Sequence, residues 1–380
     1  MRRRDFTASL GAAAGALALP AHAAAAAAER VAIARCLDYG PSLMPALRTL
    51  MDQLGGLGRI VKGKTVAMKV NLTGGATQRL SYAPLEQTHW THPAVIGALC
   101  RLMGEAGATR IRILESPWQT ADPIEEVMLE AGWEPRHMLN AATRVEMENT
   151  NYLGRAKDYR KFTPPNGGHM FPAYYLNHSY EDCDVFVSVA KLKEHATAGI
   201  TMALKNCFGI APCTIYGDGA GADEPSITPK GGRNAVFHMG RRQPSKIAPP
   251  ENDPSSPRQG GYRVPRIVAD LCAARPIHLS IVEGIYSMYG GEGPWNRGVG
   301  IIKPGILFAG TNPVNTDAVG AALMGFDPMA MRGAAPFETC DNTLALAEQH
   351  GIGTRDLSLI EVVGVPIEKA RFSYRDAKKG

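Results

Sequence analysis

Short runs of apolar residues recur along the chain, and segments with apolar residues at helical spacing separate several of them. The runs predict strands over 31–36, 65–70, 109–114, 184–189, 278–282, 305–309 and 357–363. The helical spacing predicts helices over 41–54, 93–106, 122–131, 262–274, 313–324 and 342–349. Strands that alternate with helices are typical of an α/β fold. We therefore predict a mostly parallel (mixed) sheet with helices on both faces and with long loop insertions.

Four of the predicted strands end in polar or charged side chains. In chain order these ends carry Lys69, Asn71 and Thr73, then Glu115 and Ser116, then Lys191, Lys193 and His195, and finally Glu283. Lys205 and Asn206 follow the third end closely. The carboxyl ends of parallel strands meet at one edge of a sheet, where ligands of open α/β sheets bind. We therefore expect these side chains to share one crevice, although each end taken alone also fits a strand that simply meets solvent.

The chemistry of the predicted crevice is that of an anion site. Neighbouring lysines lower one another's pKa, and such a lysine can act as a general base, as a Schiff-base nucleophile or as a clamp for carboxylate or phosphate. The candidate catalytic residues are Lys69, Lys193, His195 and Glu283. The candidate substrate-binding residues are Asn71, Thr73, Lys191, Lys205, Asn206, Arg233 and Asp317. His195 is the predicted proton shuttle, with Glu283 or Asp317 to orient it.

Two classes of function fit these residues. The first is an exported enzyme that performs acid–base chemistry on a small anionic substrate. The second is a non-catalytic binding or redox-accessory protein that uses the same lysines only as an anion clamp. Under a purely structural interpretation, each lysine extends separately to solvent and His195 only stabilises the fold.

Metal and cofactor binding stay open on the sequence. Glu115, His92 and Asp317 are weak candidates for a divalent metal, because no H-E-x-x-H or comparable spacing connects them. The seven cysteines include no C-x-x-C pair, so an iron–sulfur cluster is not expected. A disulfide between Cys207 and Cys213 is one alternative for two of them.

The first residues have the pattern of an export signal. Paired arginines at 3–4 precede an apolar stretch over 8–19 and a small-residue cleavage site at 21–23. We therefore predict a twin-arginine signal peptide over 1–23, a linker over 24–30, and a periplasmic protein that meets the twin-arginine translocase during export. The apolar stretch is too short to span a bilayer easily, and no later segment is long and apolar enough to do so.

The composition of the whole chain is that of a globular protein. With 45% hydrophobic and 20% charged residues, a chain of 380 residues can bury a large core, and we predict one domain over 31–380. The formal net charge is only +5 and the basic residues are scattered, so nucleic acid is not an expected partner. The segment 212–261 is rich in Pro and Gly and predicts an irregular insertion, either a lid or a surface arm.

Several short motifs follow one another along the chain. They are K-V-N at 69–71, T-H-P at 91–93, E-S at 115–116, A-K-L-K-E-H at 190–195, T-x-x-L-K-N-x-F-G at 201–209, E-G at 283–284, G-E-G-P at 291–294 and N-x-D-A-V at 315–319. In order and spacing they resemble the domain of unknown function family 362 (DUF362). The resemblance covers nearly the whole predicted mature chain and implies an architecture and a residue set rather than a reaction. Many relatives carry a ferredoxin-like cysteine module that this chain lacks, and the chain has Glu194 and Glu283 where relatives more often have Thr and Asp.

Overall fold

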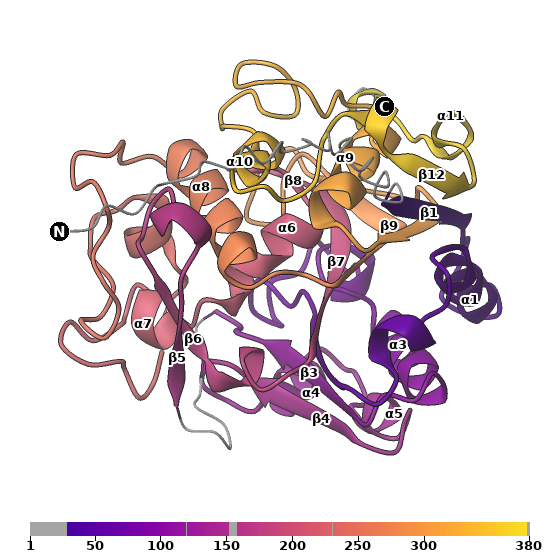
Figure 1. The fold of residues 1–380 in the computed structure, drawn as a ribbon, viewed down its shortest axis with the longest axis horizontal. Helices are drawn as coiled ribbons and strands as arrows, with labels where there is room; N and C mark the ends of the chain where they lie inside the picture. The colour runs from indigo at the N-terminus through magenta and orange to yellow at the C-terminus, as the bar shows by residue number, and fades with distance from the viewer. Residues whose placement is uncertain (1–28, 119, 152–157, 230, 378–380) are drawn as a thin grey trace, which may run out of the picture.

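Within the described residues, a ten-stranded mixed sheet forms the centre of the molecule (Figure 1). The computed structural model describes residues 29–118, 120–151, 158–229 and 231–377; the predicted signal peptide and residues 24–28 of the predicted linker lie outside them. The main path of the sheet runs through β12 (Glu361–Gly364), β1 (Arg30–Arg35), β11 (Ile306–Gly310), β9 (Leu279–Tyr289), β7 (Val185–His195), β2 (Thr65–Lys69), β3 (Arg110–Glu115) and β4 (Val145–Asn149). β8 (Gly199–Thr201) pairs with β7, and β10 (Gly300–Ile302) pairs with β9.

Parallel pairing joins the neighbouring strands from β9 through β7, β2 and β3 to β4. β11 runs antiparallel to β9, and β1 runs antiparallel to β11. The predicted mostly parallel α/β fold is therefore confirmed. The carboxyl ends of β9, β7, β2 and β3 lie at one edge of the sheet, whereas the carboxyl end of β11 lies at the opposite edge.

Helices cover both faces of this sheet and bury two hydrophobic cores (Figure 1). The first core contains residues of α1 (Leu43–Gln53), α3 (Pro93–Glu105) and α4 (Ile124–Glu130). The second contains residues of α6 (Ala203–Asn206), α8 (Gly260–Ala274), α9 (Pro313–Leu323) and α10 (Thr343–Gln349). Along β7, Val187 and Val189 belong to the first core, and Phe186 and Ala190 belong to the second. This alternation explains the continuous apolar run, because both faces of the strand are buried.

The predicted strands and helices all occur, with shifted ends. The last predicted strand is shorter, since a 3-10 turn at Leu357–Leu359 precedes β12, and β7 and β9 continue well past their predicted ends. The pattern did not predict β4, the short strands β8 and β10, or the separate hairpin of β5 (Tyr159–Phe162) and β6 (Tyr174–Asn177). β4 has the sequence V-E-M-E-N and lies at the edge of the sheet, where charged residues are typical and no apolar run forms.

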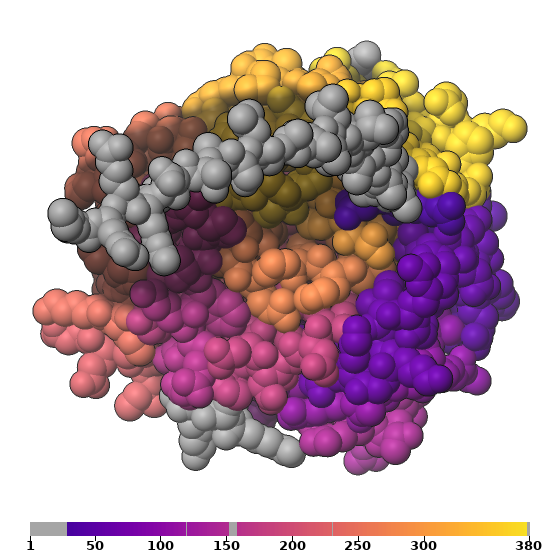
Figure 2. Space-filling view, in the orientation of Figure 1, coloured from indigo at the N-terminus to yellow at the C-terminus, as the bar shows by residue number. Residues whose placement is uncertain are grey.

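The described residues of the segment 212–261 contain α7 (Cys213–Tyr216), a π-helical turn, Asn234–His238, and the first two residues of α8, and are otherwise irregular. In Figure 2 the salmon-coloured part of the chain, to which this segment belongs, forms the left flank of the molecule. Among the described residues, no helix has the length and apolar character needed to cross a bilayer. All seven cysteines are free thiols, so the alternative of a Cys207–Cys213 disulfide is not realised.

Candidate functional site

A pocket with a volume of about 60 Å³ lies where β2, β3 and β7 reach their carboxyl ends. Its wall consists of Lys69, Asn71, Thr73, Glu115, Ser116, Trp118, Lys193, His195, Thr201, Lys205, Asn206, Phe208, Gly209, Arg233 and Glu292. This volume has room for roughly four water molecules or for a small anion of similar size.

The structure places most of the predicted site residues around this one pocket. Those that line it are Lys69, Asn71, Thr73, Lys193, His195, Lys205, Asn206 and Arg233, together with the metal candidate Glu115. Those that do not line it are Lys191, Glu283, Asp317 and His92. The chemical roles assigned to these residues stay predictions.

Lys69, the last residue of β2, forms a buried ion pair with Glu115, the last residue of β3. Lys69 Nζ lies 2.8 Å from Glu115 Oε1 and also donates to Val70 O at 2.6 Å and to Asn206 Oδ1 at 3.2 Å. Burial lowers the pKa of Lys69, and the carboxylate of Glu115 opposes that shift. These three acceptors occupy all three N–H bonds of the ammonium group, so Lys69 holds the wall of the pocket together rather than offering a donor to a ligand.

Gly209 is the residue that makes room for this ion pair. A Cβ atom at Gly209 would lie 2.8 Å from both Lys69 Nζ and Glu115 Oε1, closer than real Cβ contacts. Only glycine lets the backbone pass so close to the two charged groups.

Lys193 and Lys205 reach the pocket without a carboxylate partner. Lys193 Nζ donates to His89 O at 2.8 Å, and Lys205 Nζ lies 4.2 Å from the centroid of the Phe208 ring. Within the described parts of the chain, neither ammonium group has an Asp or Glu oxygen within 4.0 Å. Burial lowers the pKa of Lys193 well below its ordinary value and lowers the pKa of Lys205 to about 7. Both shifts arise because a buried ammonium group is unstable until an anion compensates it.

Arg233 brings a further positive charge from the irregular segment 212–261. Its Nε donates to Ala211 O, and its Nη2 donates to Ser116 O at 3.0 Å and to Ser116 Oγ at 2.7 Å. All of these acceptors are neutral, and no carboxylate of the described residues lies within 4.0 Å of the guanidinium. The guanidinium of Arg233 is therefore also left without an opposite charge in contact.

The lining side chains are positively charged overall. The four cations Lys69, Lys193, Lys205 and Arg233 face only two carboxylates, Glu115 and Glu292, which gives a formal net charge of +2 with His195 counted as neutral. An excess of cations disfavours a metal ion in this pocket and favours an anion.

Two polar atoms in the pocket wall lack hydrogen-bond partners. They are Trp118 Nε1 and Thr201 Oγ1, both buried and both unpaired among the residues that the structure describes. A buried polar group without a partner costs about 1–3 kcal/mol, so native proteins seldom keep one without a reason. Both groups can donate a hydrogen bond, so the oxygen acceptors of a ligand would suit them.

His195 and Glu292 lie beside each other in the wall of the pocket. Thr197 N donates to His195 Nδ1 at 3.1 Å, and Glu292 Oε2 lies 3.7 Å from that nitrogen. Burial lowers the pKa of His195 well below its ordinary value, so the ring is neutral at pH 7. Because Nδ1 accepts a hydrogen bond, the neutral ring carries its proton on Nε2. Burial opposes ionisation of Glu292, but the neighbouring imidazole and donors from Ala196 N and Trp295 Nε1 lower its pKa to about 2.

Lys191 and Glu283 form a separate ion pair on the other face of the sheet. Lys69 stands opposite Ser188 in the register of β2 and β7, and three positions separate Ser188 from Lys191. Since side chains alternate along a strand, Lys191 points away from the face of Lys69. Lys191 Nζ lies 2.8 Å from Glu283 Oε1, and Tyr39 OH donates to Glu283 Oε2 at 2.9 Å. The predicted catalytic Glu283 and substrate-binding Lys191 are therefore engaged with each other outside the pocket.

Asp317 and His92 serve local structure instead of lining the pocket. Asp317 accepts hydrogen bonds from Ala203 N and Leu204 N, both at 2.9 Å, and so fixes the start of α6. It lies on α9, which follows β11, and the antiparallel direction of β11 explains why the exit from that strand does not join the other exits. His92 is the N-cap of α3, where its Nδ1 accepts from Ala94 N at 3.0 Å.

Six lining residues were not among the candidate catalytic, substrate-binding or metal residues: Ser116, Trp118, Thr201, Phe208, Gly209 and Glu292. Five of them stand inside the motifs that carry the DUF362 resemblance, at 115–116, 201–209 and 291–294, so a signal for them was present in the sequence. Trp118 follows the E-S motif by two positions and had no signal of its own.

The comparison with protein families matches residues 66–322 to a family described as "Domain of unknown function (DUF362)". This match covers more than half of the chain and includes every residue that lines the pocket. The chain belongs to the DUF362 family. A curated relative of this DUF362 chain is the thylakoid-associated protein sll1697 of Synechocystis sp., which is 31% identical over 194 residues. That alignment covers 48% of this chain and 51% of the relative, so the chain spans about half the length of the curated relative it matches.

Two solved structures resemble this DUF362 protein weakly. A protein from Thermotoga maritima aligns with a TM-score of 0.34 and 16% identity, over 66% of this chain and 51% of that chain. The lactate racemase apoprotein from Thermoanaerobacterium thermosaccharolyticum aligns with a TM-score of 0.35 and 11% identity, over 74% and 54%. At these TM-scores the likeness carries no argument about function.

Proposed function

We propose that this DUF362 protein is an exported enzyme that performs acid–base chemistry on a small anionic substrate, a carboxylate or a phosphate. The observation that carries the proposal is the group of Lys193, Lys205 and Arg233. The buried Lys193 and Arg233 and the half-buried Lys205 line one small pocket, and among the described residues none of them has a carboxylate within 4.0 Å. Buried charges in proteins are normally paired, so a bound anion is the natural partner of this group. The export part of the proposal rests on the paired arginines at 3–4 and on the apolar stretch and small-residue cleavage site that follow them.

The size and polarity of the pocket support a small oxyanion. A volume of about 60 Å³ suits a group of a few non-hydrogen atoms. Asn71, Thr201 and Trp118 add neutral polar groups to the charged ones, and the last two have no partner among the described residues. Carboxylates and phosphates present the several acceptor oxygens that such a set of donors requires.

Lys205 is the residue we propose for proton transfer. A general acid or base works best when its pKa is close to the working pH, and the pKa of Lys205 is lowered by burial to about 7. His195, whose pKa burial lowers much further, is a weak base at pH 7. We assign it to donating a hydrogen bond from Nε2 to the substrate, while Lys193 and Arg233 compensate the substrate's charge.

A ligand screen with matched variants tests the proposal. Small carboxylates and phosphates are titrated into the protein, and binding is followed by the fluorescence of Trp118 in the pocket wall and by calorimetry. Ligands that bind are then incubated with the protein in D2O, where proton NMR detects exchange or conversion. Lys205→Arg keeps the positive charge and should keep binding, but its high pKa should abolish turnover.

The outcomes separate the enzyme from the anion clamp. Turnover by the wild type and its loss in Lys205→Arg support the enzyme. Binding without turnover for any ligand leaves only the non-catalytic binding protein. If no small anion binds the wild type more tightly than it binds Lys193→Met, the pocket is not an anion site. The enzyme and the non-catalytic anion clamp are then both excluded.

A further inference from the structure

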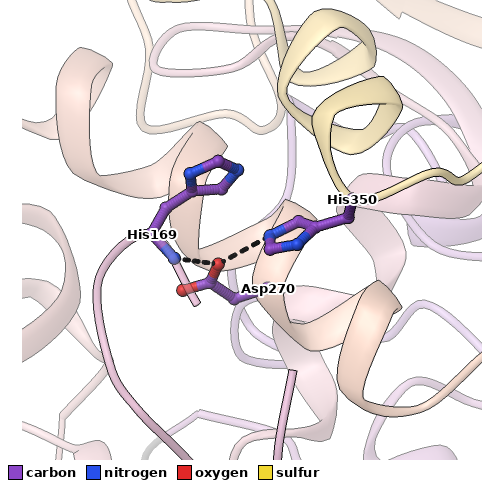
Figure 3. A group of neighbouring side chains, drawn as sticks. All are labelled: His169, Asp270 and His350. Carbon is purple, nitrogen blue, oxygen red and sulfur yellow. Dashed lines mark hydrogen bonds and ion pairs between the residues drawn. The ribbon is translucent and has the colours of Figure 1, made fainter. Parts of the chain in front are cut away.

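A second group of polar side chains lies away from the anion pocket, between α8, α10 and the loop before β6. His169 comes from this loop, Asp270 from α8 and His350 from the C-terminal end of α10 (Figure 3). Asp270 is fully buried, and the side chain of His350 is 5% exposed. None of the three residues lines the anion pocket, so this group is separate from that pocket.

The ligand atoms of the three side chains converge. One ring nitrogen of each histidine and one carboxylate oxygen of Asp270 all lie within 4.8 Å of one another. His350 Nε2 is already 3.0 Å from Asp270 Oδ1, a separation that two ligands of one metal ion also have. Figure 3 shows both imidazole rings on the same side of the Asp270 carboxylate.

The surroundings hold Asp270 in place as they hold a metal ligand. Asp270 Oδ2 accepts hydrogen bonds from Tyr174 OH at 2.8 Å and from Met170 N at 2.9 Å, which fix the plane of the carboxylate. His169 Nε2 lies 3.3 Å from Leu346 O, the type of backbone contact that orients a ligating imidazole.

The charge of Asp270 calls for a cation. Among the described residues no Lys or Arg nitrogen lies within 4.0 Å of this fully buried carboxylate, whose ion-pair partner is His350 and whose other side-chain donor is the hydroxyl of Tyr174. A buried carboxylate without a full opposite charge is costly. A divalent ion would compensate this charge.

We propose that His169, Asp270 and His350 bind a divalent transition-metal ion of the Zn²⁺ type. Two imidazoles and one carboxylate are a common protein ligand set for zinc, and a fourth position is left for water. The ion ties the loop before β6 and the end of α10 to α8. Its effect is therefore on the stability of this corner of the fold, independent of the anion pocket.

Zn²⁺ binding to untagged protein tests the site. The protein is stripped with a chelator and titrated with Zn²⁺ in competition with a chromophoric chelator, in parallel with His350→Gln, His169→Gln and the control His137→Gln. His137 is an exposed histidine of α5 (Arg136–Leu139). The wild type and the control should bind one equivalent, and each site variant should lose affinity at least about tenfold. At a concentration about a hundred times the Kd, Zn²⁺ should raise the Tm of the wild type by about 3–5 °C and leave that of the variants unchanged.

Two results would overturn the proposal. One is equal Zn²⁺ affinity in the wild type and the site variants, which would indicate binding elsewhere on the surface. The other is the absence of a stoichiometric Zn²⁺ ion in the wild type. If the variants fail to fold, Co²⁺ replaces Zn²⁺ in the wild type. An absorption spectrum of four-coordinate Co²⁺ with nitrogen and oxygen ligands supports the site, and the spectrum of hydrated Co²⁺ refutes it.

Discussion

Lys191 Nζ lies 2.8 Å from Glu283 Oε1, and neither side chain has any exposed surface. Lys191 also donates to Glu86 O at 2.6 Å, while Glu283 accepts from Tyr39 OH and from His92 N. Burial lowers the pKa of Lys191 and raises the pKa of Glu283, so each group depends on the other to stay charged. The pair thus joins β7, β9 and the start of α3. Removing one of the two charges leaves the other buried without a partner.

We predict that Lys191→Met lowers the free energy of unfolding by about 3–5 kcal/mol, because it leaves the carboxylate of Glu283 buried and unpaired. The double variant Lys191→Met/Glu283→Gln should recover much of that loss, since Tyr39 OH and His92 N can still donate to the amide oxygen. Urea denaturation measures the free energy of unfolding of the single and the double variant. Lys246→Met, at a lysine whose side chain is 78% exposed, is the control and should change the stability by less than about 0.5 kcal/mol. A loss below about 1 kcal/mol in Lys191→Met would show that the pair is dispensable.

The contrast between Lys69 and Lys191 shows where the sequence stops being informative. The apolar runs predict both strands and the positions where lysines leave them. The face on which each lysine emerges depends on the register between β2 and β7, and a shift of one residue would exchange the faces. Register depends on packing over both faces, which no local pattern in a doubly buried strand reveals.

The same limit applies to the ends of the sheet. Asp317 follows a strand exit like the others, but its strand, β11, runs antiparallel, and the apolar sequence of β11 is the same for either direction. Glu292 reaches the pocket only because β9 extends to Tyr289 and the following loop folds back beside His195. Contacts between segments so distant in the chain depend on the complete fold, whereas strands and helices follow from local periodicity.

Asp317 should make the stability of the fold depend on pH. Burial raises its pKa to about 7, against hydrogen bonds from Leu204 N and Ala203 N that favour the charged form. The folded state therefore binds a proton more strongly than the unfolded state, whose carboxyl has a pKa of about 4. The stability that the protonated carboxyl group of Asp317 contributes is fully present below about pH 4 and is lost as the pH rises through about 7. Asp317→Asn should flatten this part of the curve of unfolding free energy against pH. A variant curve parallel to that of the wild type between pH 4 and 7 would refute the assignment.

Export should depend on the paired arginines. Arg3 and Arg4 precede an apolar stretch over 8–19 and a small-residue site at 21–23, as in twin-arginine signals. We expect Arg3→Lys/Arg4→Lys to abolish the appearance of the protein in the periplasm, which cell fractionation and immunoblotting measure. The positive control is the same replacement of both arginines by lysine in a reporter protein that the twin-arginine route exports. Undiminished export of the lysine variant would point to the Sec route instead.

Lys193 should contribute strongly to anion affinity. Its ammonium group lines the pocket, has no carboxylate within 4.0 Å among the described residues, and donates only to His89 O. Lys193→Met should therefore weaken binding of a small anion by about 1.5–3 kcal/mol, or roughly tenfold to 150-fold in Kd. Isothermal calorimetry with the best ligand of the screen measures the change, and Lys246→Met should leave the affinity as it is. Equal anion affinities of the wild type and Lys193→Met would show that Lys193 does not contribute to anion binding.

Lys205 should make anion binding depend on pH around neutrality. Its pKa is lowered by burial to about 7, so the ammonium form dominates at pH 6 and the neutral amine dominates at pH 8. A bound anion stabilises the ammonium form and raises this pKa, because the opposite charge replaces lost hydration. Affinity should consequently fall as the pH rises above about 7, by up to about tenfold per pH unit.

The measurement needs an anion whose own charge is constant, so acetate or sulfate is used between pH 6 and 9 rather than phosphate. Calorimetry at pH 8 in buffers of different ionisation enthalpy should show the uptake of about one proton on binding. Lys205→Arg keeps the charge at every pH, and it should bind without proton uptake and without the fall in affinity above about pH 7. Proton uptake of the same size in Lys205→Arg would assign the titration to another group. Lys193, the other pocket lysine whose pKa burial lowers, would be the first candidate. Affinity of the wild type that stays constant from pH 6 to 9 would show that Lys205 does not contact the anion.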